Sequence, residues 1–385
     1  MRIISKIKKI RHKVYLMIFR LMPIQKNKLV FFSNNAMSYS CNPKYLTEYL
    51  LEKHPEKYDI VWVISSEINI PDDIPNKVRI VRYFSIEYLK EVSTAKFIIC
   101  NTRIPPWFMF KKRKGQYYIQ TWHGSLALKV IEKDAINYLG EQYIKDARFD
   151  SSQIDLIPAS SHMSAEQYKN GFWYNGEVLE CGTPRCDIFF DDSAKEMMRK
   201  KYEIPSEYKV LLYAPTFRND RKADIFGIDF EKIKDTLEKS TGNKWKIIFK
   251  LHPNLGGIDY KTDDSDIINI DSKADLQELL IISDILITDY SSCMFDMGLM
   301  KKECLIYAPD LEDYLKNERE MYFDISKLPF PVCRNNQELV FAIKNFDIKQ
   351  YLDNLNSFYN KIGNRECGQA CKAIEEYISK KCYGE

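Results

Sequence analysis

The chain has 385 residues, of which 45% are hydrophobic and 29% are charged, and its formal net charge is only +3. This length is too great for one ordinary domain and suits two domains, each with a core of its own. The composition excludes a disordered or low-complexity protein. The small net charge argues against a nucleic-acid-binding protein, which usually concentrates basic charge over a whole domain face.

Residues 1–27 are basic and carry apolar residues at helical intervals. Between the apolar positions stand Lys6, Lys8, Lys9, Arg11, Lys13 and Arg20. No apolar run approaches the roughly 20 residues that a membrane-spanning helix needs, and basic residues interrupt the apolar centre that a secretory signal requires. The pattern predicts a basic amphipathic helix on an anionic membrane surface. The alternative is an ordinary helix that packs its apolar side on the first domain.

From residue 28 to about residue 190, short β-rich runs alternate with amphipathic stretches. We expect buried strands at 29–33, 59–64, 78–83, 96–100, 117–121 and 154–159. Helix-like segments at 42–53 and 85–95 lie between some of them. This alternation predicts a parallel sheet with helices on both faces, which forms an N-terminal domain over 28–190.

The same pattern restarts near residue 208. We expect strands at 209–215, 245–251, 266–270, 284–288 and 303–308, with helices at 274–283 and 291–300. The charged segment 190–207 contains no strand, so we place the domain junction there and assign 191–385 to a C-terminal domain. The predicted fold class is therefore α/β, with two doubly wound, Rossmann-like domains facing across a cleft.

Polar residues cluster directly after the predicted strands, where ligands bind in such sheets. Four groups do so: His123; Thr216 and Arg218; His252; and Asp289, Ser291 and Ser292. The chain has only five histidines, so two in this position are informative.

The first of these histidines lies in WHGS, where Gly124 has no Cβ and lets a ligand or a tight turn approach the backbone beside the imidazole. A lone histidine after a strand is more often a hydrogen-bonded structural residue than a catalyst. His252 precedes a proline, which holds it extended and directs its side chain away from the strand end.

The segment DYSS, residues 289–292, stands where a helix should begin. Hydroxyl groups and free backbone N–H groups at such a position can bind a phosphate together. The alternative is that one serine or Asp289 only caps the helix. Glycine-rich dinucleotide and Walker-type fingerprints are missing from the sequence, so phosphate binding would rest on hydroxyls, helix ends, histidines and cations.

Ten cysteines are scattered along the chain without a CxxC pair, which predicts a reduced, cytosolic protein. Cys181 with Cys186, and Cys367 with Cys371, are spaced closely enough to be considered as metal ligands. Neither pair has a histidine at zinc-site spacing, and we therefore expect no metal.

Five stretches, YIQTWHGSLALK, CGTPRCD, LLYAPTFR, KLHP and LLIISDILITDYSSCMFD, occur in this order. Together with CNPKYLTEYL and AKFIICNTRIPPWF, they resemble the CDP-glycerol:poly(glycerophosphate) glycerophosphotransferase family over roughly 28–345. The resemblance implies a GT-B architecture and peripheral attachment to the cytoplasmic face of the cell membrane. It also implies cofactor-free, metal-independent transfer of polyol phosphate from a CDP-polyol in teichoic acid or capsular polymer synthesis.

Carried over position by position, the resemblance assigns His123 as the base that deprotonates the acceptor hydroxyl as it attacks the donor β-phosphorus, with CMP leaving. His252, helped by Lys250, would stabilise charge at the pyrophosphate. The remaining substrate-binding positions are Gly124, Ser125, Lys129, Arg185, Pro215, Thr216, Arg218, Asp289, Ser291, Ser292 and Asp296.

The chain departs from the family pattern in four places, one of which is SNNAMSYSCNPKY, where the family has a glycine-rich stretch near the first strand. Ser125, Leu126, Ala127 and Leu128 stand before Lys129 where Thr-Pro-Leu-Lys is usual after WHG, and Cys186 stands where PRND has asparagine. The C-terminal NRECGQAC replaces the usual DGKAS, so the last helix is assigned no role.

The resemblance implies CDP-glycerol as donor and a membrane lipid-linked saccharide or polymer as acceptor. CDP-ribitol remains an alternative donor because it would use the same pyrophosphate contacts. The acceptor step is also open among linkage-unit priming, polymerisation and capsule decoration. Two other classes remain: a GT-B glycosyltransferase that uses a nucleotide sugar, and a non-catalytic membrane-surface module.

Overall fold

The computed structural model describes residues 2–104, 111–216, 227–250, 262–271, 274–317 and 320–384. Their contacts divide the chain into two compact units. Unit 1 comprises Met1–His123, Ile131–Asp187 and Arg365–Glu385, and unit 2 comprises Gly124–Val130 and Ile188–Asn364. The chain therefore passes from unit 1 to unit 2 at the peptide bond between His123 and Gly124.

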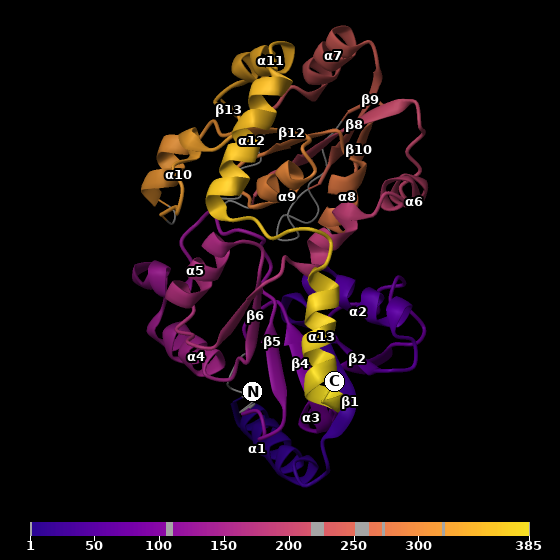
Figure 1. Ribbon diagram of the computed structural model, residues 1–385, viewed down its shortest axis with the longest axis vertical. Coiled ribbons are helices and arrows are strands. Elements are labelled where there is room, and N and C mark those ends of the chain that lie inside the picture. Colours follow the sequence, from indigo (N-terminus) through magenta and orange to yellow (C-terminus); the bar gives the residue numbers. More distant parts are fainter. Residues whose placement is uncertain are drawn as a thin grey trace. The chain divides into compact units, whose positions relative to one another are not determined.

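Unit 1 is built on a seven-stranded, all-parallel sheet with the strand order β3-β2-β1-β4-β5-β6-β7 (Figure 1). The strands are β1 (Gln25–Phe32), β2 (Asp59–Ile64), β3 (Arg79–Arg82), β4 (Ala95–Cys100), β5 (Tyr117–Gln120), β6 (Leu156–Ala159) and β7 (Glu177–Glu180). The sheet grows outward from β1 in both directions, which is the doubly wound pattern that the sequence predicts.

Helices cover this sheet. They are α1 (Arg2–Phe19), α2 (Cys41–Lys53), α3 (Ile86–Thr94), α4 (Glu141–Ser151), α5 (His162–Gly171) and α13 (Ala370–Tyr383), with short 3-10 helices η1 (Asn34–Ala36), η3 (Glu132–Tyr138) and η4 (Pro184–Phe190). α3 packs against β1, β3 and β4, while α2 and α13 pack against each other and against β1.

Unit 2 repeats the plan with six parallel strands in the order β10-β9-β8-β11-β12-β13. The strands are β8 (Tyr208–Ala214), β9 (Lys244–Phe249), β10 (Ile267–Asn269), β11 (Ile285–Thr288), β12 (Glu303–Tyr307) and β13 (Val332–Cys333). The helices are α6 (Ala194–Lys201), α7 (Phe230–Thr241), α8 (Leu276–Ile282), α9 (Cys293–Leu299), α10 (Leu311–Asn317), α11 (Asn336–Lys344) and α12 (Ile348–Ile362), with η7 (Ile325–Lys327).

The sequence of each central strand explains its position. Leu29, Val30 and Phe31 of β1 have no exposed surface, because apolar residues on both faces of a strand favour a sheet covered on both sides. Phe31 stacks on Trp62 of the neighbouring β2, with ring centroids 5.8 Å apart. Each such buried side chain contributes about 1.5–3 kcal/mol to folding.

Every strand predicted from the sequence is present, with boundaries that differ by a few residues. Two strands were not predicted, β7 and β13, and each lies at the edge of its sheet. Since an edge strand pairs on one side only, it needs neither the length nor the apolar content of a central strand. The sequence pattern of β7, with burial from exposed to intermediate, is correspondingly weak.

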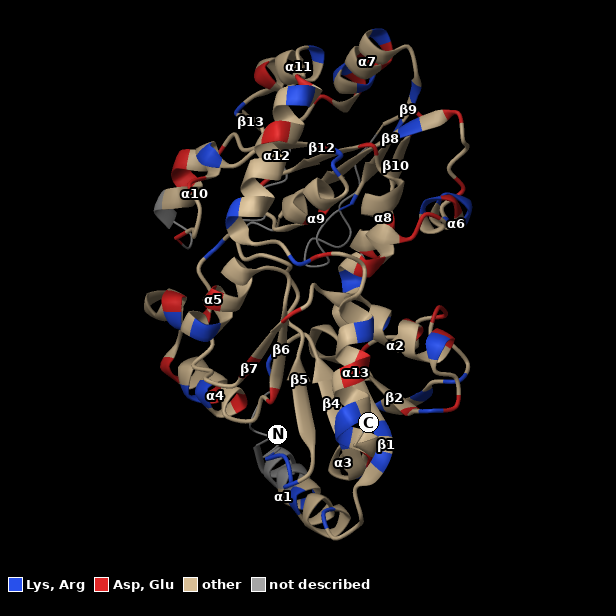
Figure 2. Ribbon diagram, in the orientation of Figure 1, with Lys and Arg blue, Asp and Glu red and all other residues tan. Residues whose placement is uncertain are grey.

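The helix predicted for the N-terminus is present as α1, and Figure 2 shows Lys and Arg residues on it. His12 and Leu16 are buried, and α1 packs on α3. A second stripe is exposed and consists of Ile10, Val14, Met17 and Ile18 of α1, with Leu21 two residues beyond its end. The helix thus packs one stripe on the rest of unit 1 and exposes apolar residues on another. No helix in the described ranges combines the length and apolar character needed to cross a membrane.

The two compact units differ from the predicted domain ranges of 28–190 and 191–385. Arg365–Glu385, which includes α13, groups with unit 1, and Gly124–Val130 groups with unit 2. Asp187 explains part of this arrangement, because its carboxylate accepts the backbone N–H groups of Ala370 and Cys371 at the start of α13, at 3.1 and 2.8 Å. Asp187 therefore stabilises the N-terminus of α13 through its charge.

Candidate active site

His123 follows β5 in unit 1, and its ring is fixed by two contacts. The ring nitrogen Nδ1 lies 3.1 Å from the carbonyl oxygen of Asn101, which only accepts hydrogen bonds, so Nδ1 carries the proton. The imidazole also lies against Trp122, with ring centroids 4.2 Å apart. In the neutral ring this tautomer leaves the lone pair on Nε2, which is the form a general base requires.

The environment favours the neutral form of His123. Surrounding protein lowers the pKa of the imidazole below its usual 6.5, and the positive charge of Arg185 lowers it further. The hydrogen bond to Asn101 and the charge of Glu132 act in the opposite direction. Part of the residue nevertheless remains exposed to solvent. A neutral histidine with an accessible edge can accept a proton near pH 7.

Arg185 lies in η4, where it contacts the backbone of His123, and the donor contact expected of it stays a prediction. It is 6% exposed, and its Nη1 donates to the carbonyl oxygen of His123 at 2.8 Å. Its backbone N–H donates to Oδ1 of Asn42 at 3.0 Å. Arg185 therefore holds the backbone of the histidine. Sequence analysis missed Asn42, which lies in α2 and not after a strand. It also missed Asn101, although Asn101 directly follows β4 and the strand-end rule could have identified it.

The segment 124–130, which directly follows His123, is held within unit 2 by side-chain hydrogen bonds. The hydroxyl of Ser125 donates to Oδ1 of Asp296 at 2.6 Å, and the amide of Gln277 donates to Oδ2 of the same carboxylate at 3.2 Å. Asp296 has no exposed surface. Its carboxylate thus anchors the 124–130 segment, and the donor contact expected of Asp296 stays a prediction.

Backbone pairing and stacking strengthen this attachment. Val130 donates its N–H to the carbonyl of Glu320 at 2.9 Å, and Tyr322 donates to the carbonyl of Leu128 at 2.9 Å. The ammonium group of Lys129 lies 5.0 Å from the centre of the Tyr314 ring. That ring in turn stacks on Tyr290 of DYSS, with centroids 3.7 Å apart. Lys129 is therefore placed beside DYSS through an aromatic pair.

The DYSS segment follows β11, as predicted, and precedes α9. Asp289 is 4% exposed and accepts the backbone N–H of Thr216 at 2.9 Å, so it organises the turn after β8, which begins with the buried Pro215. Ser291 accepts the N–H of Cys293 over 3.4 Å. Ser292 stands at the N-cap of α9 without a side-chain capping bond.

The side chain of Ser292 therefore does not cap α9, so the capping alternative does not hold for this serine. A Cβ placed on Gly124 would lie 3.5 Å from Oγ of Ser292, an ordinary contact distance. Both serines are partly exposed. Within unit 2 the structure thus brings Gly124, Ser125 and Lys129 together with the DYSS segment.

Lys250 ends the β9 region and is 8% exposed. Burial lowers the pKa of its ammonium group, while the carboxylates of Asp275 and Asp271 raise it. His252 and Arg218, the other cationic candidates predicted from the sequence, lie outside the described residues.

All ten cysteines are free thiols. Within the described ranges, no group of three or more His, Cys, Asp or Glu side chains is arranged to hold a metal ion. Cys371 is buried, and burial raises the pKa of its thiol. A buried, protonated thiol packs as a small apolar residue.

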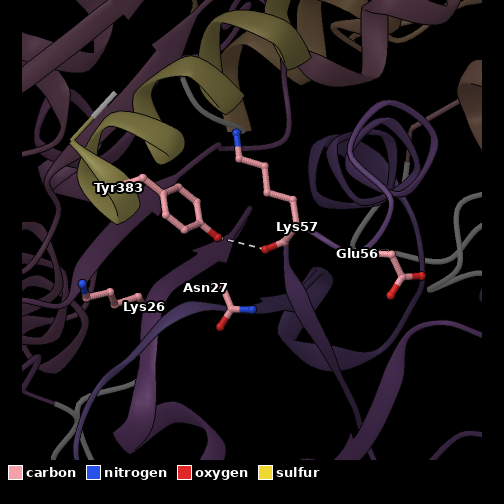
Figure 3. A pocket seen from close by; sticks show the side chains of 5 residues that line it. All are labelled: Lys26, Asn27, Glu56, Lys57 and Tyr383. Atoms are coloured by element: carbon pink, nitrogen blue, oxygen red, sulfur yellow. Dashed lines mark hydrogen bonds between the residues drawn. The ribbon is translucent and has the colours of Figure 1, made fainter.

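A pocket of about 500 Å³ lies elsewhere in unit 1 (Figure 3). It is lined by Lys26, Asn27, Glu56, Lys57 and Tyr383. The hydroxyl of Tyr383 donates to the carbonyl of Lys57 at 2.9 Å. Lys26 and Asn27 lie near the start of β1, whereas His123 follows the carboxyl end of the parallel β5. This pocket therefore lies at the amino ends of the strands, opposite to the end at which His123 lies.

Comparison with protein families gives a match over residues 14–380. The matching family is described as CDP-glycerol:poly(glycerophosphate) glycerophosphotransferase. The match includes every candidate site residue in both units. It also includes most of the exposed stripe of α1.

Curated relatives are teichoic acid enzymes. The teichoic acid poly(glycerol phosphate) polymerase of Bacillus spizizenii is 30% identical over 395 residues, which are 98% of this chain and 99% of that protein. The teichoic acid glycerol-phosphate transferase of Staphylococcus aureus is 30% identical over 390 residues, 97% of this chain and 98% of that one. The Bacillus subtilis polymerase is 29% identical over 402 residues, but the chain spans only 53% of its length.

Solved structures of teichoic acid enzymes are also similar to this chain. The wall teichoic acid polymerase TagF matches with a TM-score of 0.85 and 30% identity over 99% of this chain and 95% of that one. A TagF variant soaked with CDPG matches with a TM-score of 0.85 and 28% identity over 99% and 95% of the two chains. This likeness and the two parallel sheets confirm the predicted GT-B-like class of two Rossmann-like α/β domains.

Proposed function

Because this chain belongs to the CDP-glycerol:poly(glycerophosphate) glycerophosphotransferase family, we propose that it transfers glycerol phosphate from CDP-glycerol to a hydroxyl group of an acceptor and releases CMP. The acceptor is a membrane lipid-linked saccharide or polymer, and the product belongs to teichoic acid or capsular polymer synthesis. The enzyme is a glycerophosphotransferase. The observation that carries the proposal is the geometry of His123, whose Nδ1 is bound to a backbone carbonyl while Nε2 keeps its lone pair.

In the proposed reaction, Nε2 of His123 removes the proton from the acceptor hydroxyl as its oxygen attacks the β-phosphorus of CDP-glycerol. The bond between the β-phosphorus and the bridging oxygen breaks, and that oxygen leaves with CMP. Histidine suits this step because its neutral form accepts the proton at the pH of the cell. The lowered pKa of His123 supports the assignment.

The leaving CMP and the reacting phosphoryl group carry negative charge that the protein must stabilise. We assign the donor phosphates to the partly exposed hydroxyls of Ser291 and Ser292, the backbone at Gly124 and the ammonium group of Lys250. Thr216 remains a proposed donor contact, as do His252 and Arg218, which lie outside the described residues. Asp289, Asp296 and Arg185 position these groups through the hydrogen bonds given above.

A membrane-borne acceptor requires the enzyme to work at the membrane surface. We propose that α1 binds the anionic cytoplasmic face peripherally. The exposed stripe from Ile10 to Leu21 supports this, since apolar side chains flanked by Arg11 and Lys13 suit an interfacial helix.

The test is release of CMP by the purified chain. CDP-glycerol, CDP-ribitol and a UDP-sugar are offered in turn with membranes of a teichoic acid producer. We expect CMP from CDP-glycerol alone. CMP from CDP-ribitol alone would identify the ribitol alternative, which a Bacillus spizizenii poly(ribitol-phosphate) polymerase, 28% identical over 373 residues, keeps open. UDP without CMP would contradict the proposed chemistry.

A further inference from the structure

The side chain of Asn42, the second residue of α2, is completely buried against the turn that leads into His123. Its Nδ2 donates to the carbonyl oxygens of Thr121 and Trp122, both at 3.0 Å. Its Oδ1 accepts the backbone N–H of Arg185 at 3.0 Å. Carbonyls only accept and N–H groups only donate, so the amide can satisfy these three partners in one orientation only.

The turn that Asn42 holds is strained. Trp122 has a φ of +52°, in the left-handed region that a bulky side chain rarely adopts. The two carbonyls bound by Asn42 belong to the peptide groups on either side of the Trp122 Cα. A strained backbone of this kind persists only where its surroundings hold it, and Asn42 supplies hydrogen bonds on both sides.

The same network continues through His123. The peptide group before His123 is held by Asn42, and the carbonyl after it accepts from Nη1 of Arg185 at 2.8 Å. Arg185 is itself bound to Asn42. The ring nitrogen Nδ1 is held by the carbonyl of Asn101. Asn42 is thus the residue that links α2, the turn and η4 around the histidine.

We infer that Asn42 is a positioning residue of the transfer reaction, whose amide fixes the Trp122 turn and thereby the direction of Nε2 of His123. This inference rests on the proposed function, in which His123 is the base. Asn42 touches neither donor nor acceptor in this scheme. It acts on the reaction through the backbone of His123.

The test compares Asn42→Ala with Gln116→Ala in the full chain. Gln116 is a matched control in the same unit: it is 3% exposed, its Nε2 donates to the carbonyls of Val92 and Ala95 at 2.8 Å each, and its Oε1 accepts the N–H of Arg113 at 2.9 Å. Both variants lose two donated bonds and one accepted bond. A general loss of stability should therefore lower Tm similarly in both.

With CDP-glycerol and membrane acceptor, we expect Asn42→Ala to lower kcat on the order of 100-fold, since a misplacement of about 1 Å has an effect of this size. KM for CDP-glycerol should change by less than about threefold, because uniform binding is untouched. Gln116→Ala should keep kcat within about twofold, as expected of a residue with no part in transition-state binding. Equal losses of kcat in both variants, or wild-type kcat in Asn42→Ala, would overturn the inference.

A second readout does not depend on activity. Nitrogen-15 NMR of histidine-labelled protein, with the His123 signals identified by their loss in His123→Ala, reports the tautomer and the pKa of the ring. In Asn42→Ala we expect a mixture of tautomers and a pKa closer to the usual 6.5, with Gln116→Ala like wild type. Unchanged His123 signals in Asn42→Ala would contradict the inference about Asn42, whether or not the wild-type protein releases CMP. Absence of CMP release by the wild-type protein would instead refute the proposed function.

If Asn42→Ala does not fold, Asn42→Asp is measured in the same way. Its carboxylate has nearly the same shape and can still accept from Arg185, but it cannot donate to the carbonyls of Thr121 and Trp122. We expect the same loss of kcat, together with a raised pKa of His123 from the added negative charge. Wild-type kcat in this variant would overturn the inference.

Discussion

The hydrogen bond from Nδ1 of His123 to the carbonyl of Asn101 determines which ring nitrogen can act as a base. A backbone carbonyl is a dependable partner because it neither titrates nor rotates to become a donor. Arg185 adds positive charge that disfavours the protonated ring. At the scale of single residues, the site is therefore organised to keep His123 neutral with Nε2 available.

Replacing this histidine tests its role as base. We expect His123→Ala to reduce turnover by at least about 100-fold, in line with the usual contribution of a general base. CDP-glycerol binding, measured by calorimetry, should stay within a few-fold, because a base acts on the transition state. His162→Ala is the control, since that residue is exposed and pairs with Glu180 at 2.9 Å. Turnover that survives in His123→Ala would remove His123 from the mechanism.

The pH dependence of kcat/KM tests the protonation state of His123. The base must be neutral, so kcat/KM should fall as pH drops through the pKa of His123, and the acid limb should lie below the usual 6.5. Arg185→Gln removes a positive charge that lowers this pKa, so the limb should move to higher pH. Arg185→Lys keeps the charge and should shift the limb less. A limb at or above 6.5 in wild type would contradict the environment described for His123.

At the scale of elements, the 124–130 segment is fixed to α9 by a buried carboxylate. Ser125 and Gln277 both donate to Asp296, which has no exposed surface. A buried charge left with fewer hydrogen bonds is costly. The short segment after His123 is therefore anchored within unit 2 by its hydrogen bond to Asp296.

Ser125→Ala measures this anchor. We expect a loss of about 1.5–3 kcal/mol in the free energy of unfolding, the usual range for a hydrogen bond to a charged group. Ser326→Ala removes an equally short Ser–Asp bond, 2.6 Å to Asp324, from an exposed site. There water replaces the lost donor, and the change should stay within about 0.5 kcal/mol. Equal effects in denaturant unfolding would show that the Asp296 contact is not a buried anchor.

The strands that could be predicted from the sequence are the central ones, such as β1 and β2, because burial on both faces demands continuous apolar runs. The edge strands β7 and β13 do not need continuous apolar runs, and their sequences therefore give a weaker signal. The rule that ligands bind after strand ends located His123, Thr216 and Asp289. It could not locate Asn42 or show that Asp296 points inward, since these depend on which elements pack together.

At the scale of the whole molecule, each unit is completed by a segment distant in sequence. The amphipathic pattern of α13 shows that one face is buried, but not which sheet it packs against, and the structure places it in unit 1. Thr183 and Glu366 contribute to this placement, with the hydroxyl donating to the carboxylate at 2.7 Å. Sequence order alone therefore could not predict the composition of the units.

The proposed membrane surface is also a property of the whole molecule. Met17 and Leu21 are 70% and 86% exposed. Because burying one such side chain contributes about 1.5–3 kcal/mol, Met17→Glu and Leu21→Glu should each weaken binding to phosphatidylglycerol vesicles by at least about tenfold. Binding should also fall as salt is raised. Phe341→Glu, at a 68% exposed position of α11, is the control. Wild-type sedimentation of the Met17→Glu and Leu21→Glu variants with the vesicles would exclude this surface.

The most direct test of the proposed chemistry follows the β-phosphate. CDP-glycerol labelled with phosphorus-32 at the β-phosphate is given to the purified enzyme with membrane acceptor, and the label and the released nucleotide are quantified together. Attack at the β-phosphorus predicts one CMP released for each labelled phosphate joined to the acceptor, with both lost in His123→Ala. Release of labelled CDP, with unlabelled acceptor, would contradict phosphoryl transfer by this enzyme.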